Sequence, residues 1–538
     1  MVTSTNIYDE VMYPGYAFPQ THPDRLATIA TLCGMQPAPV ERCRVLELGC
    51  SDGNNLLPLA LLYPESRFVG IDLAGRPLEL GRALVGELGL KNIELRQFDV
   101  MAVEPDFGEF DYIVAHGLFS WVPAAVREKV LSVCRANLAP QGVAFISYNA
   151  YPGGYARQML REMMLFHVRN IEEPQQRINQ SRAFLKFLLD AQQPSDDPYR
   201  ILLEKETERV LTHPDGHFFH DDLEETNAMF YFTQFVEQAA RHDLQFLAEA
   251  DFFEMQDYSF PPHVGEKLRS LSDNIVLKEQ YADFIKCRRF RQTLLCHGEV
   301  EVRREPRPER LRRFHIASPA RPAAPQPDIK STTVERFDGI KGAAVSTDNP
   351  LAKAALVHLG ELWPLTLAFD ELLDAAHRRL GVEPTETTEM NAPVESRAID
   401  SPESDARLLC DILWQLYGAN LVELHLTPSR FVLESSERPL ASPLARLQMQ
   451  RSPVVTSLRH TSVSIPDEFG RRLLELLDGT RDRPALLAEL RALLEAGVPL
   501  LDDGDQPASD SDQPASASLE EHLERNLSSL ARHALLVA

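Results

Sequence analysis

A glycine-containing turn with acidic neighbours is the part of this chain best suited to chemistry. Residues 45–48 form a mostly apolar run that leads into Gly49-Cys50-Ser51-Asp52-Gly53-Asn54-Asn55. Gly49 and Gly53 carry no Cβ, so the backbone at these points can approach a ligand closely. A second apolar run, residues 68–71, ends at Asp72, whose carboxylate could accept hydrogen bonds from two ribose hydroxyls. The pattern predicts a strand, a nucleotide-binding loop, a helix and a second strand.

The details of this loop indicate which nucleotide it could bind. A dinucleotide site of the G-x-G-x-x-G type requires glycine where this chain has Ser51 and Asn54, which disfavours NAD and FAD. Glu47, Gly49 and Gly53 instead form an E-x-G-x-x-x-G sequence, which resembles the first motif of class I S-adenosylmethionine-dependent methyltransferases. The resemblance implies S-adenosylmethionine as cofactor. It also implies a set of cofactor-binding residues, namely Glu47, Gly49, Cys50, Ser51, Gly53, Asn54, Asp72, Leu73, Asp99, Val100 and His116.

Further apolar runs end in polar residues in the order that such a fold requires. Residues 93–98 end at Asp99, which could receive an adenine amine, and residues 110–115 end at His116. Residues 143–148 end at Asn149. Because strands alternate with helical patterns, we expect an α/β fold, a Rossmann-like, doubly wound, seven-stranded sheet of the class I methyltransferase type. Ligands of such sheets bind beyond the carboxyl ends of the strands.

Several segments are similar to a narrower family. Together they resemble the bacterial protein lysine methyltransferases known from methylation of rickettsial outer-membrane proteins, including the methyltransferase regulatory segment of that family. The resemblance spans most of the chain and is carried by residues 8–26, 115–123, 147–153, 280–284 and 288–295. Ser51 departs from the pattern, because relatives often carry a third glycine there; we expect it to narrow the loop without abolishing binding.

A lysine acceptor would require aromatic or apolar surroundings. A free lysine titrates near ~10.4 and is charged at neutral pH, whereas the nucleophile must be neutral. Desolvation in an aromatic channel would lower its pKa, and ring faces would stabilise a methylammonium product. Seven aromatic residues could line such a channel, although ordinary packing is the alternative for each: Tyr13, Tyr16, Phe18, Phe119, Trp121, Tyr148 and Tyr151.

Five residues are the catalytic candidates. Tyr16, Trp121 and Tyr148 are the preferred channel residues, because their segments should meet at the strand ends. His116 could act as a base near physiological pH, or it could contribute only a backbone carbonyl to the cofactor. Asn149 could orient an amine, or it could simply be a turn residue.

The pattern of helices, strands and prolines predicts five segments. We expect a cofactor-binding core with an N-terminal lid segment at 1–154 and a helical insertion at 155–216. Residues 217–300 should be a regulatory segment that completes the sheet through strands at 244–250 and 291–296, or else a small middle domain. A Pro/Arg-rich linker at 301–330 should precede a mainly α, winged-helix-like domain at 331–538, with helices at 350–362, 369–380 and 406–417 and disordered loops at 383–404 and 502–518.

Composition excludes several classes of function. A net charge of -24 over 538 residues disfavours a nucleic-acid substrate. Seven cysteines without a C-x-x-C pair argue against a disulfide framework and a metal centre. No apolar run approaches the ~18 residues of a bilayer span, and the polar start does not resemble a signal peptide. We therefore expect a cytoplasmic protein with no membrane partner.

The nature of the acceptor is left between two chemistries. The N/D-P-P-Y motif of adenine and glutamine methylation, and the Pro-Cys nucleophile of cytosine methylation, are both absent at residues 115–118. A protein substrate with an accessible lysine is favoured, and a small amine or hydroxyl compound is the alternative. A noncatalytic interaction protein is disfavoured because the acidic and glycine residues of the cofactor site are all present. Self-association as a homodimer is left open.

Overall fold

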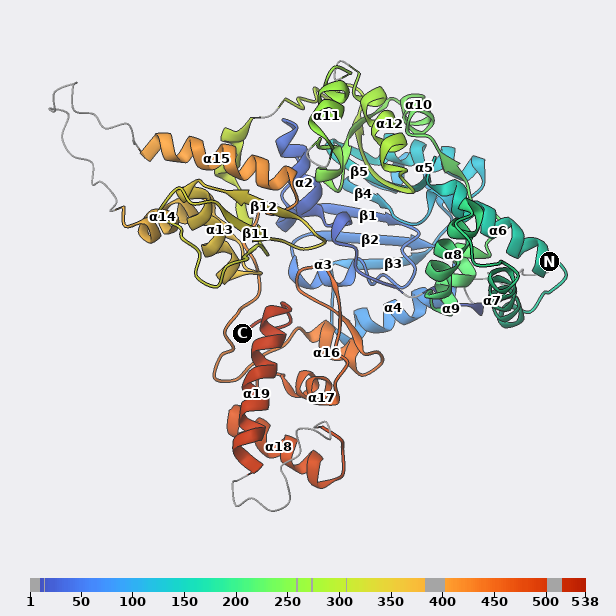
Figure 1. The fold of residues 1–538 in the computed structure, drawn as a ribbon. Coiled ribbons are helices and arrows are strands. Elements are labelled where there is room, and N and C mark those ends of the chain that lie inside the picture. The colour runs from blue at the N-terminus through green and yellow to red at the C-terminus, as the bar shows by residue number, and fades with distance from the viewer. Residues whose placement is uncertain are drawn as a thin grey trace. The chain divides into compact units, whose positions relative to one another are not determined.

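The chain forms two compact units in the computed structural model (Figure 1). The structure describes residues 10–13, 15–257, 260–271, 274–305, 307–382, 402–500 and 515–538. The first unit comprises Met1–Tyr16 and Gly34–Val302, and the second comprises Ala17–Cys33 and Arg303–Ala538. The chain therefore leaves the first unit at residue 17, returns to it at residue 34 and leaves it again at residue 303.

The first unit is built on one mixed sheet with the strand order β3-β2-β1-β4-β5-β8-β7, and β6 pairs with β5. Neighbours among β1 to β5 run parallel, whereas β8 runs antiparallel to β5 and to β7. The strands are β1 (Arg44–Leu48), β2 (Arg67–Asp72), β3 (Ile93–Gln97), β4 (Phe110–Ala115), β5 (Leu138–Ala150), β6 (Met229–Phe230), β7 (Leu244–Glu249) and β8 (Phe290–His297). This is the predicted class I methyltransferase sheet. The addition is β6, whose two residues are too few to show a periodic pattern.

Helices cover the sheet because its strands are apolar on both faces. Against one face, α5 (Ala124–Asn137) and α10 (Phe232–Ala240) bury Leu131 and Phe235 beside Leu48 and Ile113. The other helices of the sheet region are α3 (Leu57–Leu62), α4 (Gly75–Glu87), α11 (Pro262–Arg269) and α12 (Ile275–Lys286). Figure 1 shows helices flanking β1 to β5.

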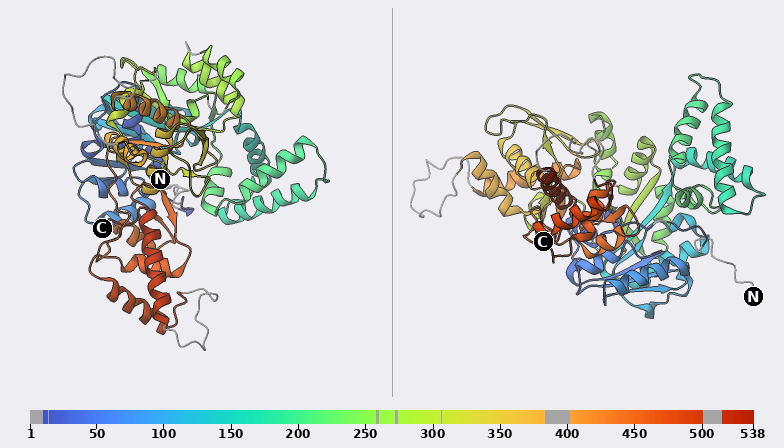
Figure 2. Two further views of the ribbon diagram at one scale, coloured as in Figure 1. Left: turned by 60° about the vertical axis from the view of Figure 1, so that its left-hand side comes forward. Right: turned by 90° about the horizontal axis from the view of Figure 1, so that it is seen from below.

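The predicted helical insertion has a core of its own. Its helices are α6 (Gly154–Val168), α7 (Pro174–Asp190) and α8 (Pro198–Leu211), which Figure 2 shows projecting from the sheet. Glu173 and Asp197 accept backbone N–H groups at the starts of α7 and α8, and a proline follows each, which explains where both helices begin. The core also contains Phe218 and Phe219, which lie just after α9 (Asp215–His217) on the short helix η6 (Phe218–Asp222).

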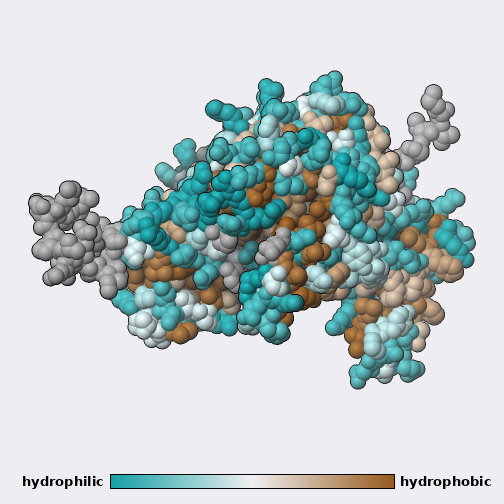
Figure 3. All heavy atoms as spheres, turned by 90° about the horizontal axis from the view of Figure 1, so that it is seen from above, coloured by the Kyte–Doolittle hydropathy of each residue, from teal (hydrophilic) through white to brown (hydrophobic). Residues whose placement is uncertain are grey.

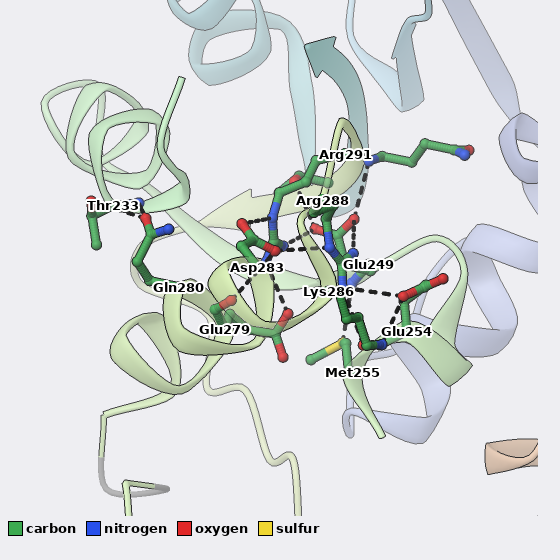
Figure 4. A network of polar contacts seen from close by, with 12 residues as sticks. Thr233, Glu249, Glu254, Met255, Glu279, Gln280, Asp283, Lys286, Arg288 and Arg291 are labelled. Atoms are coloured by element: carbon green, nitrogen blue, oxygen red, sulfur yellow. Dashed lines mark hydrogen bonds and ion pairs between the residues drawn. The ribbon is translucent and has the colours of Figure 1, made fainter. Parts of the chain in front are cut away.

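A buried ion cluster joins β7 and β8 to α12 (Figure 4). The Arg291 guanidinium, fully buried, donates to Glu249 at 2.6 Å and to Asp283 at 2.8 and 2.9 Å, and it also contacts Glu279 at 3.1 Å. Arg288 pairs with Asp283 at 2.8 Å. Buried charges are tolerated when each has such partners. The cluster therefore holds α12 against the last two strands of the sheet, all of them within the regulatory segment.

The second unit begins with a region that differs from the predicted linker. Residues 303–426 pack around one core with α2 (Pro23–Leu32), and Ile316 and Ala320 are fully buried there. Residues 301–330 are therefore not a linker, because β9 (His315–Ala317) is the central strand of a three-stranded sheet. The other elements are β10 (Arg321–Pro322), β11 (Glu335–Asp338), β12 (Ala344–Thr347), α13 (Pro350–Leu362), β13 (Leu367–Ala368), α14 (Phe369–Leu380), α15 (Pro402–Gly418) and β14 (Glu423–His425). The three predicted helices are thus present.

A separate apolar cluster organises the end of the chain. It is formed by helices that carry buried apolar residues four positions apart, such as Phe469 and Leu473 of α17 and Leu486 and Leu490 of α18. The elements are α16 (Pro443–Met449), β15 (Val454–Thr456), β16 (Ser462–Ser464), α17 (Glu468–Leu476), α18 (Arg483–Glu495) and α19 (Ala515–Arg532). The strands β15 and β16 form a hairpin.

The two segments predicted to be disordered lie mostly outside the described residues. Of residues 383–404 the structure describes 402–404, which begin α15, and of residues 502–518 it describes 515–518, which begin α19.

Hydrophilic residues cover most of the face seen in Figure 3, with hydrophobic patches between them. Among the described helices, none combines the length and the apolar character needed to cross a bilayer.

Candidate functional site

The loop after β1 adopts the conformation that its glycines make possible. Gly49 and Gly53 have φ angles of +76° and +74°, and Ser51 lies between them at +49°. The Gly49 N–H donates to Ile71 O at 2.8 Å, which holds the start of the loop against β2. Ser51 occupies the left-handed region that glycine adopts without strain. Ser51 therefore replaces the glycine that relatives often carry, but the loop still adopts the left-handed conformation at this position.

Close packing behind the loop leaves no room for larger residues. A Cβ on Gly53 would lie 2.8 Å from Leu95 Cδ2, and a Cβ on Gly81 of α4 would lie 2.1 Å from Asp52 O. A Cβ on Gly15 would lie 2.1 Å from Asp52 Oδ1, so the N-terminal segment also passes directly against the loop. The loop is thus held from three sides, which fixes the direction of its backbone.

Glu47 is a buried carboxylate at the end of β1. It is 4% exposed, and its Oε1 accepts a hydrogen bond from Asn55 Nδ2 at 2.8 Å. Its Oε2 is buried without a hydrogen-bond partner among the described residues. Burial, together with repulsion from Asp52 and Asp72, raises the pKa of Glu47 to about 8. A buried acceptor left open in this way is suited to a ligand that brings a donor or a positive charge.

Three other acidic residues belong to the site: Asp72 ends β2, Asp99 lies just after β3, and Asp52 lies in the loop. Asp72 Oδ2 accepts from Ser51 N at 2.8 Å and Oδ1 accepts from Ala74 N at 2.9 Å, so its carboxylate is oriented by the loop itself. Asp99 is exposed, and its Oδ1 accepts from Met101 N at 2.9 Å. Burial raises the pKa of Asp52 to about 6. Glu47, Asp52 and Asp72 thus place three acidic groups around one loop, which favours a cationic ligand over a neutral one.

The remaining residues predicted to bind the cofactor have different degrees of exposure. Leu73 is 55% exposed and Val100 is half-buried, so both retain apolar surface next to Asp72 and Asp99. Cys50 is buried under the loop. Asn54 Nδ2 donates to Asp52 Oδ2 at 2.7 Å and lies 3.5 Å from Gly15 O. The carboxylates, the open Glu47 oxygen and these apolar side chains fit an adenosyl ligand with a charged amino-acid end.

His116 lies at the end of β4, next to this group. Its ring stacks on Phe145 at a centroid distance of 5.8 Å and meets Phe290 edge-on at 6.2 Å. Burial lowers the pKa of His116 to about 4. The imidazole is therefore neutral at physiological pH, and it is a weak proton acceptor.

Tyr148 and Asn149 occupy positions that the strand alternation could not reveal. The Tyr148 ring is 1% exposed and stacks on Phe235 at 4.1 Å, so it lies in the core and not on a channel wall as we expected. Its hydroxyl contacts Thr293 Oγ1 at 3.2 Å. Asn149 Nδ2 donates to Asn227 Oδ1 at 2.8 Å, which connects β5 to the regulatory segment.

Tyr16 and Trp121 lie near a set of residues that the sequence did not indicate. The Tyr16 ring stacks on His217 at 5.7 Å, and the Arg161 guanidinium lies 5.5 Å from the centre of the Trp121 ring. Arg161 in turn donates to the carbonyl of Asp221 at 2.7 Å. His217 and Asp221 precede and follow the apolar pair Phe218 and Phe219. A histidine and an acidic residue in a helical segment carry no motif, so only the fold could identify them.

Metal chemistry has no evident ligand set here. Within the described parts of the chain, no group of three or more histidine, cysteine or acidic side chains is placed to hold a metal ion.

Three protein-family models match the chain. They are a methyltransferase domain at residues 45–142, a predicted methyltransferase regulatory domain at 214–297 and the PKMT C-terminal winged helix domain at 437–535. The last match assigns the winged helix to α16 to α19, a narrower region than the predicted 331–538. Helices α13, α14 and α15 belong to the preceding core and not to the winged helix.

Two similar proteins match nearly the whole chain, and a third matches about half of it. The uncharacterized protein RP789 of Rickettsia prowazekii is 35% identical over 503 residues, which cover 92% of this chain and 87% of the relative. RP028 of the same organism is 38% identical over 249 residues, which cover 46% of this chain and all of the relative. Among solved structures, PKMT2 from Rickettsia typhi in complex with AdoHcy is 28% identical with a TM-score of 0.85, and the match covers 98% of this chain and 100% of PKMT2.

Proposed function

Because this chain belongs to the family of bacterial class I S-adenosylmethionine-dependent methyltransferases with a regulatory domain and a PKMT winged helix, we propose that its methyl acceptor is a lysine side chain of a protein. The cofactor is S-adenosylmethionine. The proposal concerns the acceptor. The loop at residues 49–55, here called the cofactor loop, is by itself common to enzymes with many acceptors.

The extent of the similarity is the observation that carries this proposal. PKMT2 matches this chain over 98% of its length, and that match takes in the insertion, the regulatory segment and the C-terminal domains as well as the cofactor loop. Acceptor specificity resides in such additional segments, because the sheet is shared by unrelated methyltransferases. A net charge of -24 also favours approach of a basic, lysine-bearing protein segment.

The contribution of the protein to methyl transfer is mainly positioning. Bound S-adenosylmethionine would supply an electrophilic methyl group on a sulfonium. Glu47, Asp52 and Asp72 would hold the ligand, and the acceptor must be kept in line with the methyl carbon and away from water. His116 is poorly suited as the base, because burial lowers its pKa to about 4 and so makes it a weaker proton acceptor than an ordinary imidazole. A different proton acceptor, or release of the proton to solvent before binding, is therefore required.

Label transfer to a complex mixture tests the proposal. The purified full-length protein is incubated with radiolabelled S-adenosylmethionine and fractionated bacterial lysate, and labelled protein is then hydrolysed and its amino acids are separated. We expect the label in mono-, di- or trimethyllysine. Label confined to low-mass metabolites would instead identify a small amine or hydroxyl compound as acceptor. Asp72→Ala provides the control, since it removes a cofactor ligand and should abolish labelling of either kind.

A further inference from the structure

An N-terminal segment bridges the cofactor loop and the start of the regulatory domain. Its backbone is held at one end by His220, whose Nε2 lies 2.5 Å from Val11 O. At the other end Gly15 lies against Asp52, and its carbonyl is 3.5 Å from Asn54 Nδ2. The side chains of Tyr13 and Tyr16 therefore lie between the cofactor loop and the helix η6.

The two tyrosines converge on one imidazole. The Tyr13 ring meets His217 edge-on, with centroids 4.7 Å apart and planes at 77°, while the Tyr16 ring stacks on His217 at 5.7 Å and 19°. Tyr13 Oη lies 3.5 Å from Asp221 Oδ2. All four side chains are half-buried, so they remain accessible. We call this group the strap site, defined as Tyr13, Tyr16, His217 and Asp221.

Asp221 differs from its neighbour Asp222 in how its charge is satisfied. Asp222 accepts from Arg157 at 2.8 Å and contacts His213 at 2.8 Å. The carboxylate of Asp221 lies 3.5 Å from the Tyr13 hydroxyl, which is longer than an ordinary O–H···O hydrogen bond. Burial raises the pKa of Asp221 to about 6. Among the described residues the Asp221 carboxylate has no shorter hydrogen bond, and a partly desolvated carboxylate of this kind costs stability, which is typical of functional groups.

We propose that the strap site binds the ammonium group of the acceptor, with the rings around the cation and the carboxylate of Asp221 as its counter-ion and proton acceptor. The inference rests on the proposed lysine specificity. Aromatic faces attract alkylammonium ions, and a carboxylate beside them supplies the hydrogen-bond acceptor that an ammonium requires. The strap site adjoins the cofactor loop through Gly15, as an acceptor site must.

The proposed step balances without another reactant. The acceptor nitrogen loses a proton to Asp221, so an N–H bond breaks and an O–H bond forms. The freed lone pair then forms the bond to the methyl carbon, while the bond between that carbon and sulfur breaks and its electrons stay on sulfur. A raised pKa makes Asp221 a better proton acceptor than an ordinary aspartate.

Asp221→Asn tests the inference in the full-length protein. The acceptor probe is the set of lysate proteins that the wild type labels, and methyllysine is quantified after hydrolysis. We expect the rate to fall on the order of 10²-fold, as for loss of a general base, with the dissociation constant for S-adenosylmethionine unchanged by calorimetry. Glu225→Gln, an exposed acid four residues away, is the matched control and should behave as the wild type.

The pH profile separates a proton acceptor from a purely structural residue. The rate of the wild type should fall as the pH decreases through about 6, because Asp221 becomes protonated. Asp221→Asn should lack this inflection. The charged groups that act on Asp221 are Arg157, Asp222, His213 and Arg161.

Two tyrosine variants test the rings. Tyr16→Ala should raise KM about 3- to 30-fold with a smaller effect on kcat, as expected for loss of a cation–π contact, and Tyr16→Phe, which keeps the ring, should restore most of that loss. Tyr13→Phe removes only a hydroxyl that lies 3.5 Å from Asp221 Oδ2 and should therefore change the rate less than Tyr16→Ala does.

The outcomes distinguish this inference from the proposed function. If the wild type forms methyllysine and Asp221→Asn forms it equally fast, the strap site is not the acceptor site although lysine remains the acceptor. If the wild type labels small molecules and no lysine, the proposed function fails and this inference fails with it. If Asp221→Asn no longer binds S-adenosylmethionine, Asp221 supports the cofactor loop, and the inference is overturned as well.

Discussion

Asn55 Nδ2 donates a hydrogen bond of 2.8 Å to Glu47 Oε1, while the second oxygen of the same carboxylate is buried and open. This pair links the last turn of the cofactor loop to the strand that precedes it. The pKa of Glu47, raised to about 8 by burial and by nearby carboxylates, means that the group is largely protonated at neutral pH before a ligand arrives.

Binding of the cofactor should therefore depend on pH. As the pH rises from about 5 to about 8, Asp52 and then Glu47 lose protons, so the site becomes more negative and its affinity for the sulfonium should increase about tenfold or more. Calorimetry with S-adenosylmethionine measures this. S-adenosylhomocysteine, which lacks the sulfonium charge, should show a weaker dependence. An equally steep pH dependence in Glu47→Gln would contradict the role given to Glu47.

Gly15→Ala should disturb the loop from the side of the N-terminal segment. The new Cβ would lie 2.1 Å from Asp52 Oδ1, so either the segment or the carboxylate must move. A displacement of about 1 Å near a reacting centre costs about 10²-fold in rate, and we expect a loss of that order. Gly86→Ala in α4 is the control, because nothing lies within 4 Å of its new Cβ. Equal activity of the two variants would show that the segment does not constrain the loop.

Arg291→Met should destabilise the first unit strongly. It leaves Glu249, Glu279 and Asp283 buried with one compensating cation fewer, and breaking such a buried pair costs about 3–5 kcal/mol. Urea denaturation followed by tryptophan fluorescence gives the free energy of unfolding. Arg269→Met breaks an exposed pair with Asp257 and should cost less than about 1 kcal/mol. A small effect of Arg291→Met would mean that the cluster does not stabilise the packing of α12 on β7 and β8.

Tyr148→Phe separates packing from catalysis. The variant loses the contact with Thr293 and should lower the free energy of unfolding by about 1 kcal/mol, but the ring that packs on Phe235 is kept. Methyl transfer should stay at the wild-type rate. A large loss of activity with normal stability would restore Tyr148 as a residue of the acceptor channel.

The second unit should lose stability at alkaline pH. Although burial opposes it, Asp24 at 3.0 Å and Glu423 at 3.4 Å raise the pKa of His425 to about 9. Because an unfolded histidine titrates near ~6.5, this stabilisation is complete below about pH 6.5 and is lost as the pH rises through about 9. Thermal unfolding between pH 7 and about pH 9.5 measures the loss. His425→Gln should flatten the curve, whereas His533→Gln, at an exposed position, should not.

Two histidines in the same unit make its stability depend on pH in the opposite direction. Burial lowers the pKa of His22 to about 4 and that of His460 well below its ordinary value. Their neutral forms are favoured in the folded state, so stability is lost as the pH falls below about 6.5. The unit should be most stable between these two limits.

The strand-loop-helix-strand unit around the predicted cofactor loop could be predicted because its signal is local. Gly49, Gly53 and Asp72 lie in one strand-loop-helix-strand unit, and the strand ends follow from short apolar runs. The Tyr148 ring was placed on the wrong side because β5 is buried on both faces, so alternation could not show which face meets the core. His217 and Asp221 were not found because Tyr13, about 200 residues away in sequence, gives them their setting.

The C-terminal half shows a different limit of sequence reasoning. Three helices were expected at 350–362, 369–380 and 406–417, and the structure has helices at these places, the third extending over Pro402–Gly418, yet they were assigned to the wrong domain. Helical periodicity shows that a helix has an apolar face but not which core that face enters. The partner of these helices includes β9, and its three residues lie in a proline-rich stretch that indicated a linker.

The route of the N-terminal helix also constrains biosynthesis. Asp24 of α2 bonds to His425, 401 residues later, and both belong to the second unit. At translation rates of about 5–20 residues per second, α2 waits on the order of 20 to 80 s for that partner to be made. Leu32 of the same helix also lacks its core neighbours until later in synthesis, because the rest of that cluster begins at Leu311. A nascent chain of this protein should therefore be a client of ribosome-associated chaperones until these segments emerge.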